Sequence, residues 1–464
     1  MRAEGLGLQA HARKFPTGMK DLARYIRARG LELGLYTTSG NFTCAGEVGS
    51  TGSRSLGSGG HQREDVDLWV REWGVTYVKH CLCNTTAEIR REAFPTMRRA
   101  IDAAQAARRG DHSPGTWKSD APQAPQVVYE CANYPDRPWE GQHFEGCNVW
   151  RVSADVPDSF QGWTAVLDQA VADDVNRRAG AHGAGGQDGV WGGGWSSFDY
   201  LRIREGGGQT LEQYRAQMSM WAVLGAPLFI GVDVRTLSDA ALAIYKNADV
   251  IAVSQDPAGV VGYRLYQDAA SQVEVWVRPL SPSASSCRRD VRQGATSGRQ
   301  GADETRWTVQ AAGDRPYSEG PGTVGGGAVS ADGVMGAVDC QPRAALVLLN
   351  RSPRQQTVRV TLQQLVQGTG LESWGDVLRS QMLAPVRVSV RDLWKHAGPQ
   401  AFVGVDAGGE ARAGIAGPAG NELAGALEVA VGATTAFMGV ATLLSVDPII
   451  TPLPPGEEHA VWGG

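Results

Sequence analysis

The chain has 464 residues, 20% of them charged, and a formal net charge of -5 at pH 7. This length accommodates one large domain and a smaller one, and the mild acidity disfavours nucleic acid and anionic membrane surfaces as main partners. The first residues, Met-Arg-Ala-Glu-Gly, include no apolar stretch typical of a signal peptide. The one candidate membrane segment, residues 429–446, alternates and contains Gly and Thr, which favours a pair of strands.

Between about residues 15 and 235 the sequence alternates between helix-like and strand-like segments. The predicted helices cover residues 15–29, 65–73, 96–107, 163–178 and 211–224. The predicted strands cover residues 31–36, 75–79, 126–131, 148–153 and 226–232. Short strands that are separated by helices predict a parallel sheet, either a barrel or a doubly wound sheet.

After about residue 263 the pattern changes to strands without intervening helices. These strands are predicted at residues 273–277, 344–349, 357–362, 386–390 and 427–444. We therefore expect a large α/β domain over residues 1–262 and an all-β domain over residues 263–464. Three segments have loop-like composition, and the last of them, rich in Ser, Gly and Arg, is typical of a disordered insertion: residues 110–126, 179–194 and 279–327.

Seven cysteines are an odd number, so the simplest accounting is three disulfides and one free thiol. They are Cys44, Cys81, Cys83, Cys131, Cys147, Cys287 and Cys340. The spacing within Cys81-Leu-Cys83 is shorter than that of zinc-binding pairs, and no pair of histidines follows it. Three Asn-x-Ser/Thr triplets, at Asn41, Asn84 and Asn350, are compatible with a secretory history.

Six sequence blocks agree in order with one enzyme family. They are Phe15-Pro-x-Gly18, residues 33–44, Trp73-Gly-Val-x-Tyr-Val-Lys79, residues 147–156, Ala226-Pro-Leu-Phe-Ile230 and residues 250–256. Residues 346–351 and 391–394 fit as well. With these blocks in register, the chain resembles the α-galactosidase family, family 27 of the glycoside hydrolases. The resemblance covers most of residues 1–265 and, more weakly, the remainder.

The resemblance implies a (β/α)8 TIM barrel followed by an antiparallel β-sandwich. It also implies retaining hydrolysis of terminal α-galactosides by two carboxylates roughly 5 Å apart, one attacking the anomeric carbon and one protonating the leaving oxygen. No metal or organic cofactor is implied. The implied partners are α-galactoside oligosaccharides or glycoconjugates, with no nucleic acid and no membrane, and a homodimer is compatible with the family. The implied location is the secretory pathway, either extracellular or in a lysosome or vacuole.

Residue by residue, the resemblance assigns candidate roles. Asp155 falls on the acid/base aspartate, although the following Val-Pro also suits a helix N-cap. Lys79 ends a predicted buried strand, where a lysine needs a partner. Asp199 lies in a motif that departs from the family's Trp-Asn-Asp-Pro-Asp-Met, because Ser196 and Ser197 replace Asn and Asp. The candidate substrate-binding residues are Tyr36, Cys44, Lys79, Arg151 and Asp199. Without the resemblance, packing would explain Tyr36 and a salt bridge would explain Arg151.

The family register also pairs the cysteines. It implies disulfides Cys44–Cys83 and Cys131–Cys147, whereas a bridge between Cys287 and Cys340 has no support from the family. Cys81 is then the odd thiol. It occupies the nucleophile position, where the family has aspartate in the pattern Lys-Tyr/Phe-Asp-x-Cys.

Further departures bear on activity. Ala132 stands where galactose-preferring animal members place Glu, and a small residue there is similar to the N-acetylgalactosaminidase relatives. The chain also begins after the family's first two barrel strands, which predicts an incomplete barrel of low stability.

Three functions follow from the resemblance and its departures. The leading hypothesis is an impaired α-galactosidase-like glycosidase that acts on galactose or N-acetylgalactosamine. The alternative is an inactive carbohydrate-binding relative, a pseudoenzyme. A third hypothesis makes Cys81 a thiolate nucleophile, which Lys79 could assist because it shares a strand face with Cys81, while His80 points to the opposite face.

Overall fold

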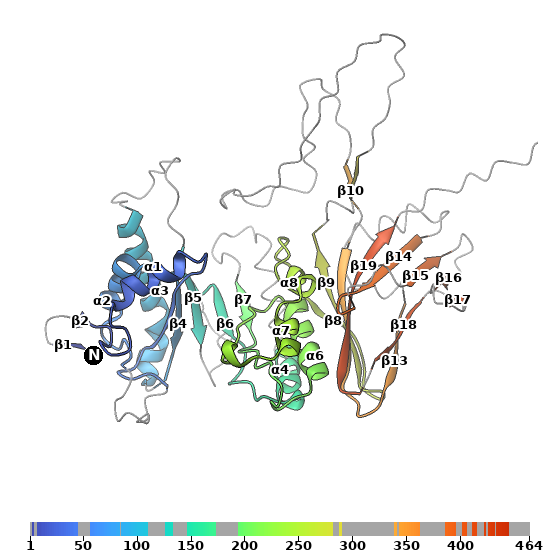
Figure 1. Cartoon of the computed structure of the whole chain (residues 1–464), viewed down its shortest axis with the longest axis horizontal. Coiled ribbons are helices and arrows are strands. Elements are labelled where there is room, and N and C mark those ends of the chain that lie inside the picture. Colours follow the sequence, from blue (N-terminus) through green and yellow to red (C-terminus); the bar gives the residue numbers. More distant parts are fainter. Residues whose placement is uncertain are drawn as a thin grey trace, which may run out of the picture. The chain divides into compact units, whose positions relative to one another are not determined.

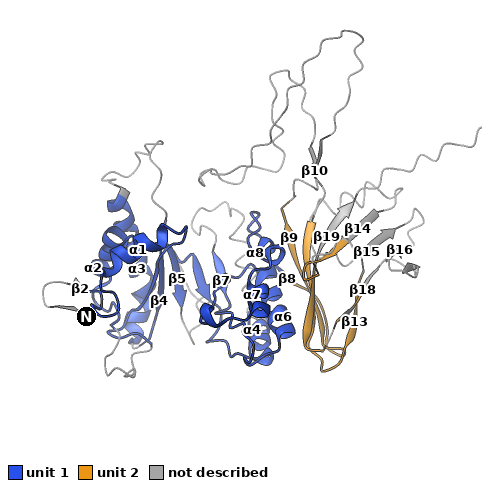
Figure 2. Cartoon of the chain, viewed as in Figure 1, with its two compact units in different colours: residues 1–263 blue, residues 264–464 orange. Residues whose placement is uncertain are grey.

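The chain forms two compact units in the computed structural model, residues 1–263 and residues 264–464 (Figure 2). The structure describes residues 2–3, 7–44, 56–83, 85–109, 126–132, 146–172, 194–281, 287–289, 338–340, 343–361, 386–395, 401–405, 411–414, 422–423, 426–431 and 433–444. All candidate site residues lie in the first unit, so its sheet is the scaffold that matters for function.

The first unit is built on a five-stranded sheet (Figure 1) whose strands lie in sequence order and are all parallel. Its strands are β3 (Gly34–Thr38), β4 (Tyr77–Cys81), β5 (Val128–Ala132), β6 (Val149–Arg151) and β7 (Trp195–Ser197). A parallel bridge between Leu201 and Ile230 follows. Sequential parallel strands with helical crossovers are the winding of a (β/α) barrel. Over the described residues the sheet is open, with β3 and β7 at its edges.

Helices connect these strands, and α2 continues directly into a π-helical turn, η1. They are α1 (Gly18–Arg27), α2 (Gln62–Asp67), η1 (Leu68–Trp73), α3 (Ala87–Arg109), α4 (Phe160–Ala172), α6 (Leu211–Val223), η4 (Val234–Thr236), α7 (Asp239–Tyr245) and α8 (Ala248–Ser254). Two short strands near the start, β1 (Arg2–Ala3) and β2 (Gly7–Leu8), pair only with each other, antiparallel.

The two faces of strand β4 differ in burial. Val78 and His80 are fully buried in the layer between sheet and helices, where the His80 ring packs edge-on against Phe94 of α3. Tyr77, Lys79 and Cys81 alternate with them and are only partly buried. Because successive strand residues point to opposite faces, these three side chains share the face that carries the candidate site. The core that holds the helices to the sheet includes Val66, Trp69, Phe94, Met97, Ile101 and Tyr129.

The second unit is all-β over its described residues. Its larger sheet has the order β17-β16-β15-β14-β19-β12-β9-β8, and a second sheet pairs β13 with β18. The strands are β8 (Tyr263–Asp268), β9 (Val273–Leu280), β12 (Arg343–Asn350), β13 (Gln356–Thr361), β14 (Val386–Asp392), β15 (Ala401–Val405), β16 (Ala411–Gly414), β17 (Glu422–Leu423), β18 (Ala426–Val431) and β19 (Thr435–Leu444). Strand β18 also contacts β12, β15, β16 and β19 of the larger sheet. This is an antiparallel sandwich.

A separate two-stranded ribbon in this unit pairs β10 (Cys287–Arg289) with β11 (Val338–Cys340), and its backbone register sets Cys287 opposite Cys340. The predicted segment 427–444 forms two strands, as expected, but they do not pair with each other. Strand β18 pairs with β13, and β19 lies between β12 and β14. No helix in the described ranges is long and apolar enough to cross a membrane.

Several boundaries differ from the prediction. The strand predicted at residues 226–232 is wrong, because only Ile230 forms a bridge, and Pro227 has no N–H to donate to a ladder. Helix α3 begins at Ala87 and contains Pro95, whereas a start at Thr96 was predicted. Strand β9 runs to Leu280, so the insertion predicted from residue 279 starts later. Most of the three predicted loop segments, residues 110–125, 179–193, 282–286 and 290–327, lie outside the described residues.

Candidate functional site

The candidate site begins with the shared face of β3, β4 and β5. Tyr36 pairs in register with Lys79, and Lys79 pairs in turn with Glu130. One step nearer the carboxyl ends of the strands, Cys81 pairs with Ala132. Residues that pair across parallel strands point to the same face, so these side chains form a contiguous patch at the strand ends. This is the edge at which barrel enzymes place their active sites.

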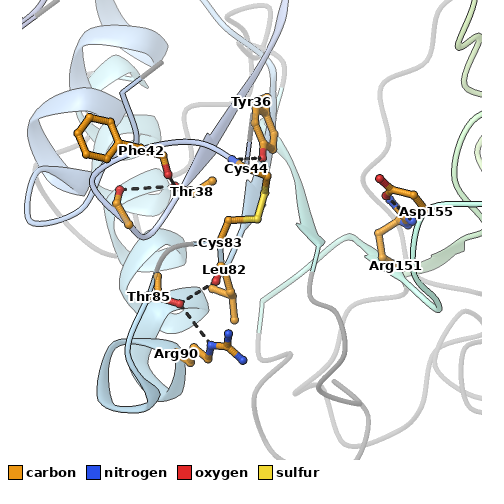
Figure 3. Close-up of a disulfide and its surroundings, with 11 residues drawn as sticks. Tyr36, Thr38, Phe42, Cys44, Leu82, Cys83, Thr85, Arg90, Arg151 and Asp155 are labelled. Atoms are coloured by element: carbon orange, nitrogen blue, oxygen red, sulfur yellow. Dashed lines mark hydrogen bonds and ion pairs between the residues drawn. A yellow bond between two sulfur atoms is a disulfide. The ribbon is translucent and has the colours of Figure 1, made fainter. Parts of the chain in front are cut away.

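A disulfide between Cys44 and Cys83 ties together the segments that follow β3 and β4 (Figure 3). The Tyr36 hydroxyl lies against it, donating to Cys44 Sγ at 2.8 Å and accepting from the Cys44 N–H at 3.4 Å. Cys44 therefore positions Tyr36. A second disulfide, Cys131–Cys147, joins the end of β5 to the segment before β6. Both pairings implied by the resemblance are confirmed. Among the described cysteines whose side chains are placed, Cys81 is the one that forms no disulfide.

The surroundings of Cys81 favour the protonated thiol over the thiolate. Burial raises the pKa of Cys81 above its usual value, against the opposing effects of a hydrogen bond with Tyr36 and the charges of Lys79 and Arg151. A thiol is a far weaker nucleophile than a thiolate. His80 gives no help, because it lies on the opposite face between Ser39 Oγ, at 2.7 Å, and the Tyr129 hydroxyl, at 2.8 Å. The surroundings of Cys81 therefore do not favour the thiolate hypothesis.

Lys79 forms the ion pair that its burial requires with Glu130, a residue that the sequence analysis did not identify. Its Nζ lies 3.4 Å from Glu130 Oε1, and the Tyr77 hydroxyl donates to Glu130 Oε2 at 2.7 Å. The same Nζ lies 5.0 Å from the ring centroid of Tyr200. A signal was available, because an acidic residue inside a predicted buried strand needs a cation and Lys79 is one.

Arg151 is the centre of the other part of the site. Its Nη1 lies 3.1 Å from Asp199 Oδ1, and its Nη2 lies 3.2 Å from both Asp155 Oδ1 and the carbonyl oxygen of Ser153. The two carboxylates differ sharply in environment, since the Asp199 side chain is 1% exposed and the Asp155 side chain is 87% exposed. Figure 3 shows Arg151 and Asp155 side by side. Asp199 is thus a buried structural partner, whereas Asp155 is free to approach a ligand.

Asp199 is held in an unusual backbone conformation. Its φ is 72°, a left-handed value that residues other than glycine adopt at a cost of roughly 1 kcal/mol or more. Its Oδ2 accepts a hydrogen bond from the Val156 N–H at 2.8 Å, and its carbonyl oxygen accepts one from Trp221 Nε1 at 3.3 Å. These contacts hold the strained residue and also place the Asp155 segment. Helix α4 begins at Phe160, so Asp155 is not its N-cap.

The two parts of the site lie within electrostatic reach of each other. Burial is the main cause that raises the pKa of Tyr36, and the charge of Asp155 adds to it. The charge of Arg151 likewise acts on Cys81. The structure therefore brings together Tyr36, Cys44, Lys79, Cys81, Arg151, Asp155 and Asp199 at one end of the sheet. Within the described segments, no cluster of acidic, histidine and cysteine side chains is arranged to hold a metal ion.

Comparison with known proteins gives a consistent result. The family described as Alpha galactosidase A matches residues 1–256. The chain is 31% identical over 279 residues to Alpha-galactosidase A of Cellvibrio japonicus, covering 59% of each protein. It is 33% identical over 290 residues to human Alpha-N-acetylgalactosaminidase, covering 61% of this chain and 62% of that protein. The chain thus spans about three-fifths of the length of the curated relatives it matches.

Solved structures show the same fold at lower identity. The crystal structure of alpha-galactosidase I from Mortierella vinacea aligns with a TM-score of 0.59 and 19% identity, covering 95% of this chain and 84% of that one. An alpha-galactosidase from Saccharomyces cerevisiae, solved with raffinose, aligns with a TM-score of 0.56 and 18% identity, covering 96% of this chain and 87% of that one. At these identities the likeness concerns the fold alone, an α/β barrel-type unit followed by an antiparallel β unit.

Proposed function

The chain belongs to the Alpha galactosidase A family, and from that premise we propose that it is a glycoside hydrolase-type protein for terminal α-linked galactose or N-acetylgalactosamine. Its turnover is held low by Cys81. The observation that supports this proposal is that Lys79, Arg151, Asp155 and Asp199 lie on the same side of the sheet as Cys81. The family resemblance is what gives Cys81 the position of the nucleophile.

The proposed binding role rests on charge and position. Lys79 and Arg151 present donors, and Tyr36 presents a hydroxyl; Tyr36 and Lys79 lie at the middle of β3 and β4, and Arg151 ends β6. Sugar hydroxyls both donate and accept, so a site with fixed cations and carboxylates can hold several of them at once. Asp155 is the exposed carboxylate beside Arg151, which suits a group that exchanges a proton with the leaving oxygen.

The proposed weakness lies in the covalent step. Cys81 must first lose its thiol proton to water; attack by Sγ on the anomeric carbon would then form a C–S bond and break the C–O bond, while Asp155 gives its own proton to the leaving oxygen. Water must then break the C–S bond, and sulfur is protonated poorly by a carboxylic acid. A carboxylate nucleophile avoids this obstacle because it leaves readily. The thiol also reaches the first step protonated, which slows attack.

The preferred sugar depends on the space beside Cys81. Ala132 pairs in register with Cys81 and is buried, and its side chain is a single methyl group. A residue of this size leaves room for a substituent larger than a hydroxyl on the bound sugar. N-acetylgalactosamine is therefore the better candidate ligand, and galactose is the smaller alternative.

Binding and turnover, measured separately on the full chain, test the proposal. Calorimetric titration with N-acetylgalactosamine and with galactose should give saturable binding. Glucose, which differs from galactose in the orientation of one hydroxyl, should bind more weakly. Release of an aryl group from an aryl α-galactoside should be negligible. Absence of binding to both sugars would contradict the proposed site. Brisk turnover that is abolished by alkylating thiols would instead make Cys81 a working nucleophile.

The disulfides bear on where the protein acts. Two bridges, Cys44–Cys83 and Cys131–Cys147, form in the first unit. Such bonds persist in oxidising compartments and are rare where glutathione keeps thiols reduced. We therefore assign the protein to the secretory pathway or the cell exterior. Mass spectrometry of the natural protein under non-reducing conditions tests this, since two reduced pairs would contradict it.

A further inference from the structure

Glu130 carries a buried negative charge that is not fully satisfied within the protein. Its side chain is 2% exposed, and it lies inside strand β5. Its Oε1 has no hydrogen-bond partner among the described residues, although Lys79 Nζ is 3.4 Å away. A buried carboxylate oxygen without a hydrogen bond is costly, because it has lost water and gained only an ion pair. The missing donor must come from outside the described side chains.

The geometry also determines where that donor would lie. Tyr77 donates to Oε2 at 2.7 Å and so holds the carboxylate plane. The other oxygen, Oε1, is then held on the side of Lys79, whose side chain is 14% exposed. Both residues are on the face that carries Cys81 and Ala132. The charge of Glu130 also contributes to the raised pKa of Cys81, so the two side chains interact electrostatically. The unsatisfied oxygen is therefore in the candidate site.

An acceptor and a cationic donor side by side match a hydroxyl group. A hydroxyl can donate its hydrogen to Glu130 Oε1 while its oxygen accepts from Lys79 Nζ. Both hydrogen bonds would be assisted by charge in a water-poor setting, where such bonds are strong. A bound water molecule could make the same two contacts in the free protein, and a sugar hydroxyl would then displace it.

We propose that Glu130 is a further sugar-binding residue, whose Oε1 together with Lys79 Nζ holds one hydroxyl of the bound sugar. This inference rests on the proposed sugar-binding function. It adds an anionic acceptor, deeper in the sheet than Cys81, to the contacts described above. It also gives a reason for a carboxylate to be buried in the middle of β5.

Glu130→Gln tests the proposal with little change in shape, since the amide oxygen can still accept from Tyr77 while an amide donor faces Lys79. We expect this variant to bind N-acetylgalactosamine or galactose about ten- to a hundred-fold more weakly, the loss typical of a hydrogen bond to a charged group. Glu32→Gln is the matched control. Glu32 is likewise a carboxylate paired with a cation, here Arg27, but it lies before β3, at the other end of the sheet. It should bind the sugar as the unaltered chain does.

A set of monodeoxy galactoses separates contact from a structural effect. If Glu130 holds one hydroxyl, the deoxy sugar that lacks it should bind the unaltered chain weakly, and Glu130→Gln should cause no further loss for that sugar alone. Equal further losses for every deoxy sugar would show that Glu130 does not touch the ligand and would overturn the proposal. If Glu130→Gln proves unstable, Glu130→Asp keeps the charge and withdraws it by one methylene, and the same pattern must appear. Failure of the unaltered chain to bind any sugar would instead contradict the proposed function.

Discussion

The two parts of the candidate site are held in different ways. The part on β3, β4 and β5, with Tyr36, Lys79, Cys81 and Glu130, is tied by two disulfides to the loops around it. The part at the ends of β6 and β7, with Arg151, Asp155 and Asp199, is held by ion pairs and by one strained backbone residue. Disulfides and ion pairs are removed by different substitutions, so the two parts of the site can be altered separately.

The comparison also separates binding from chemistry. Binding needs many donors and acceptors in register, and both parts supply them through the strand pairing. Chemistry depends on the identity of single residues. In the proposed function, the Cys81 thiol of the first part stands where a carboxylate would be the counterpart of Asp155. A sheet can therefore retain a binding surface after one substitution removes most of its catalytic power.

The largest expected effect comes from restoring a carboxylate to the first part. Cys81→Asp should raise the hydrolysis of an aryl α-galactoside by roughly 10³-fold or more, because a carboxylate can both attack and leave. Release of the aryl group in steady state measures it. Cys81→Asn, which has the same shape without the charge, is the control and should remain inactive. Adding Asp155→Asn should remove the gain. Equal activity of the Asp and Asn variants would refute the assignment of position 81.

The next effect contrasts the two carboxylates around Arg151. Asp199→Asn should lower the free energy of unfolding by about 3 kcal/mol or more, because it leaves a buried arginine without its buried counter-ion. Asparagine also tolerates the left-handed backbone, so the loss reports on the charge. Asp155→Asn should cost at most about 1 kcal/mol, since its side chain is 87% exposed. Denaturant unfolding followed by tryptophan fluorescence compares them, and similar losses would contradict the difference in environment.

A smaller effect is expected from cutting the covalent tie of the first part. Replacing both Cys44 and Cys83 by serine opens a link between residues 39 positions apart and should cost about 2–4 kcal/mol of unfolding free energy. Sugar binding should weaken as well, because the Tyr36 hydroxyl loses its partner sulfur. The Cys131/Cys147 double serine variant opens a shorter link, between residues 16 positions apart, and leaves Tyr36 in place. It should lose stability but retain more affinity, and the reverse order of affinities would count against Tyr36 as a ligand.

The smallest expected effect is a pH dependence of the free energy of unfolding. It comes from His80, which lies on the helix-facing side of β4. Burial lowers the pKa of His80 to about 3, well below its unfolded value of about 6.5. The unfolded chain therefore binds a proton that the folded chain does not. The stability is complete above about pH 6.5 and is lost progressively as the pH falls toward 3, by about 1 kcal/mol between pH 7 and 5.5. His80→Gln should flatten this dependence in chemical unfolding, whereas His11→Asn, at an exposed position, should not. An unchanged slope in His80→Gln would contradict it.

The sequence predicted the parts of the fold that have strong local patterns. Strand β4 was recognisable as a short strand between two helices, and the family resemblance implied both disulfides of the first unit. Strand β7 was missed, because its three residues, Trp195–Ser197, follow a glycine-rich segment and carry too little pattern. The opposite error occurred at residues 226–232, where an apolar run resembled a strand but makes a single bridge.

The candidate site was predictable only where single residues could be matched to the motifs of the family. Lys79 signalled that a partner existed, but pairing it with Glu130 requires the register between β4 and β5, which no local pattern contains. The unequal burial of Asp155 and Asp199 was equally hidden, because both are aspartates near strand ends. What distinguishes them is contact with the Val156 N–H and with Trp221, from segments far apart in the sequence.

The backbone of Asp199 narrows the amino acids that this position can accept. At a φ of 72°, only glycine, asparagine and aspartate are tolerated at low cost. The aspartate codon is one nucleotide change from an asparagine codon and one from a glycine codon, and only aspartate supplies the charge that Arg151 needs. Random mutation at this codon therefore has few folded outcomes, and nearly all of them lose the ion pair. In a library that varies position 199 fully, selection for folding should enrich aspartate most, ahead of asparagine and glycine, which suit the backbone but lose the ion pair.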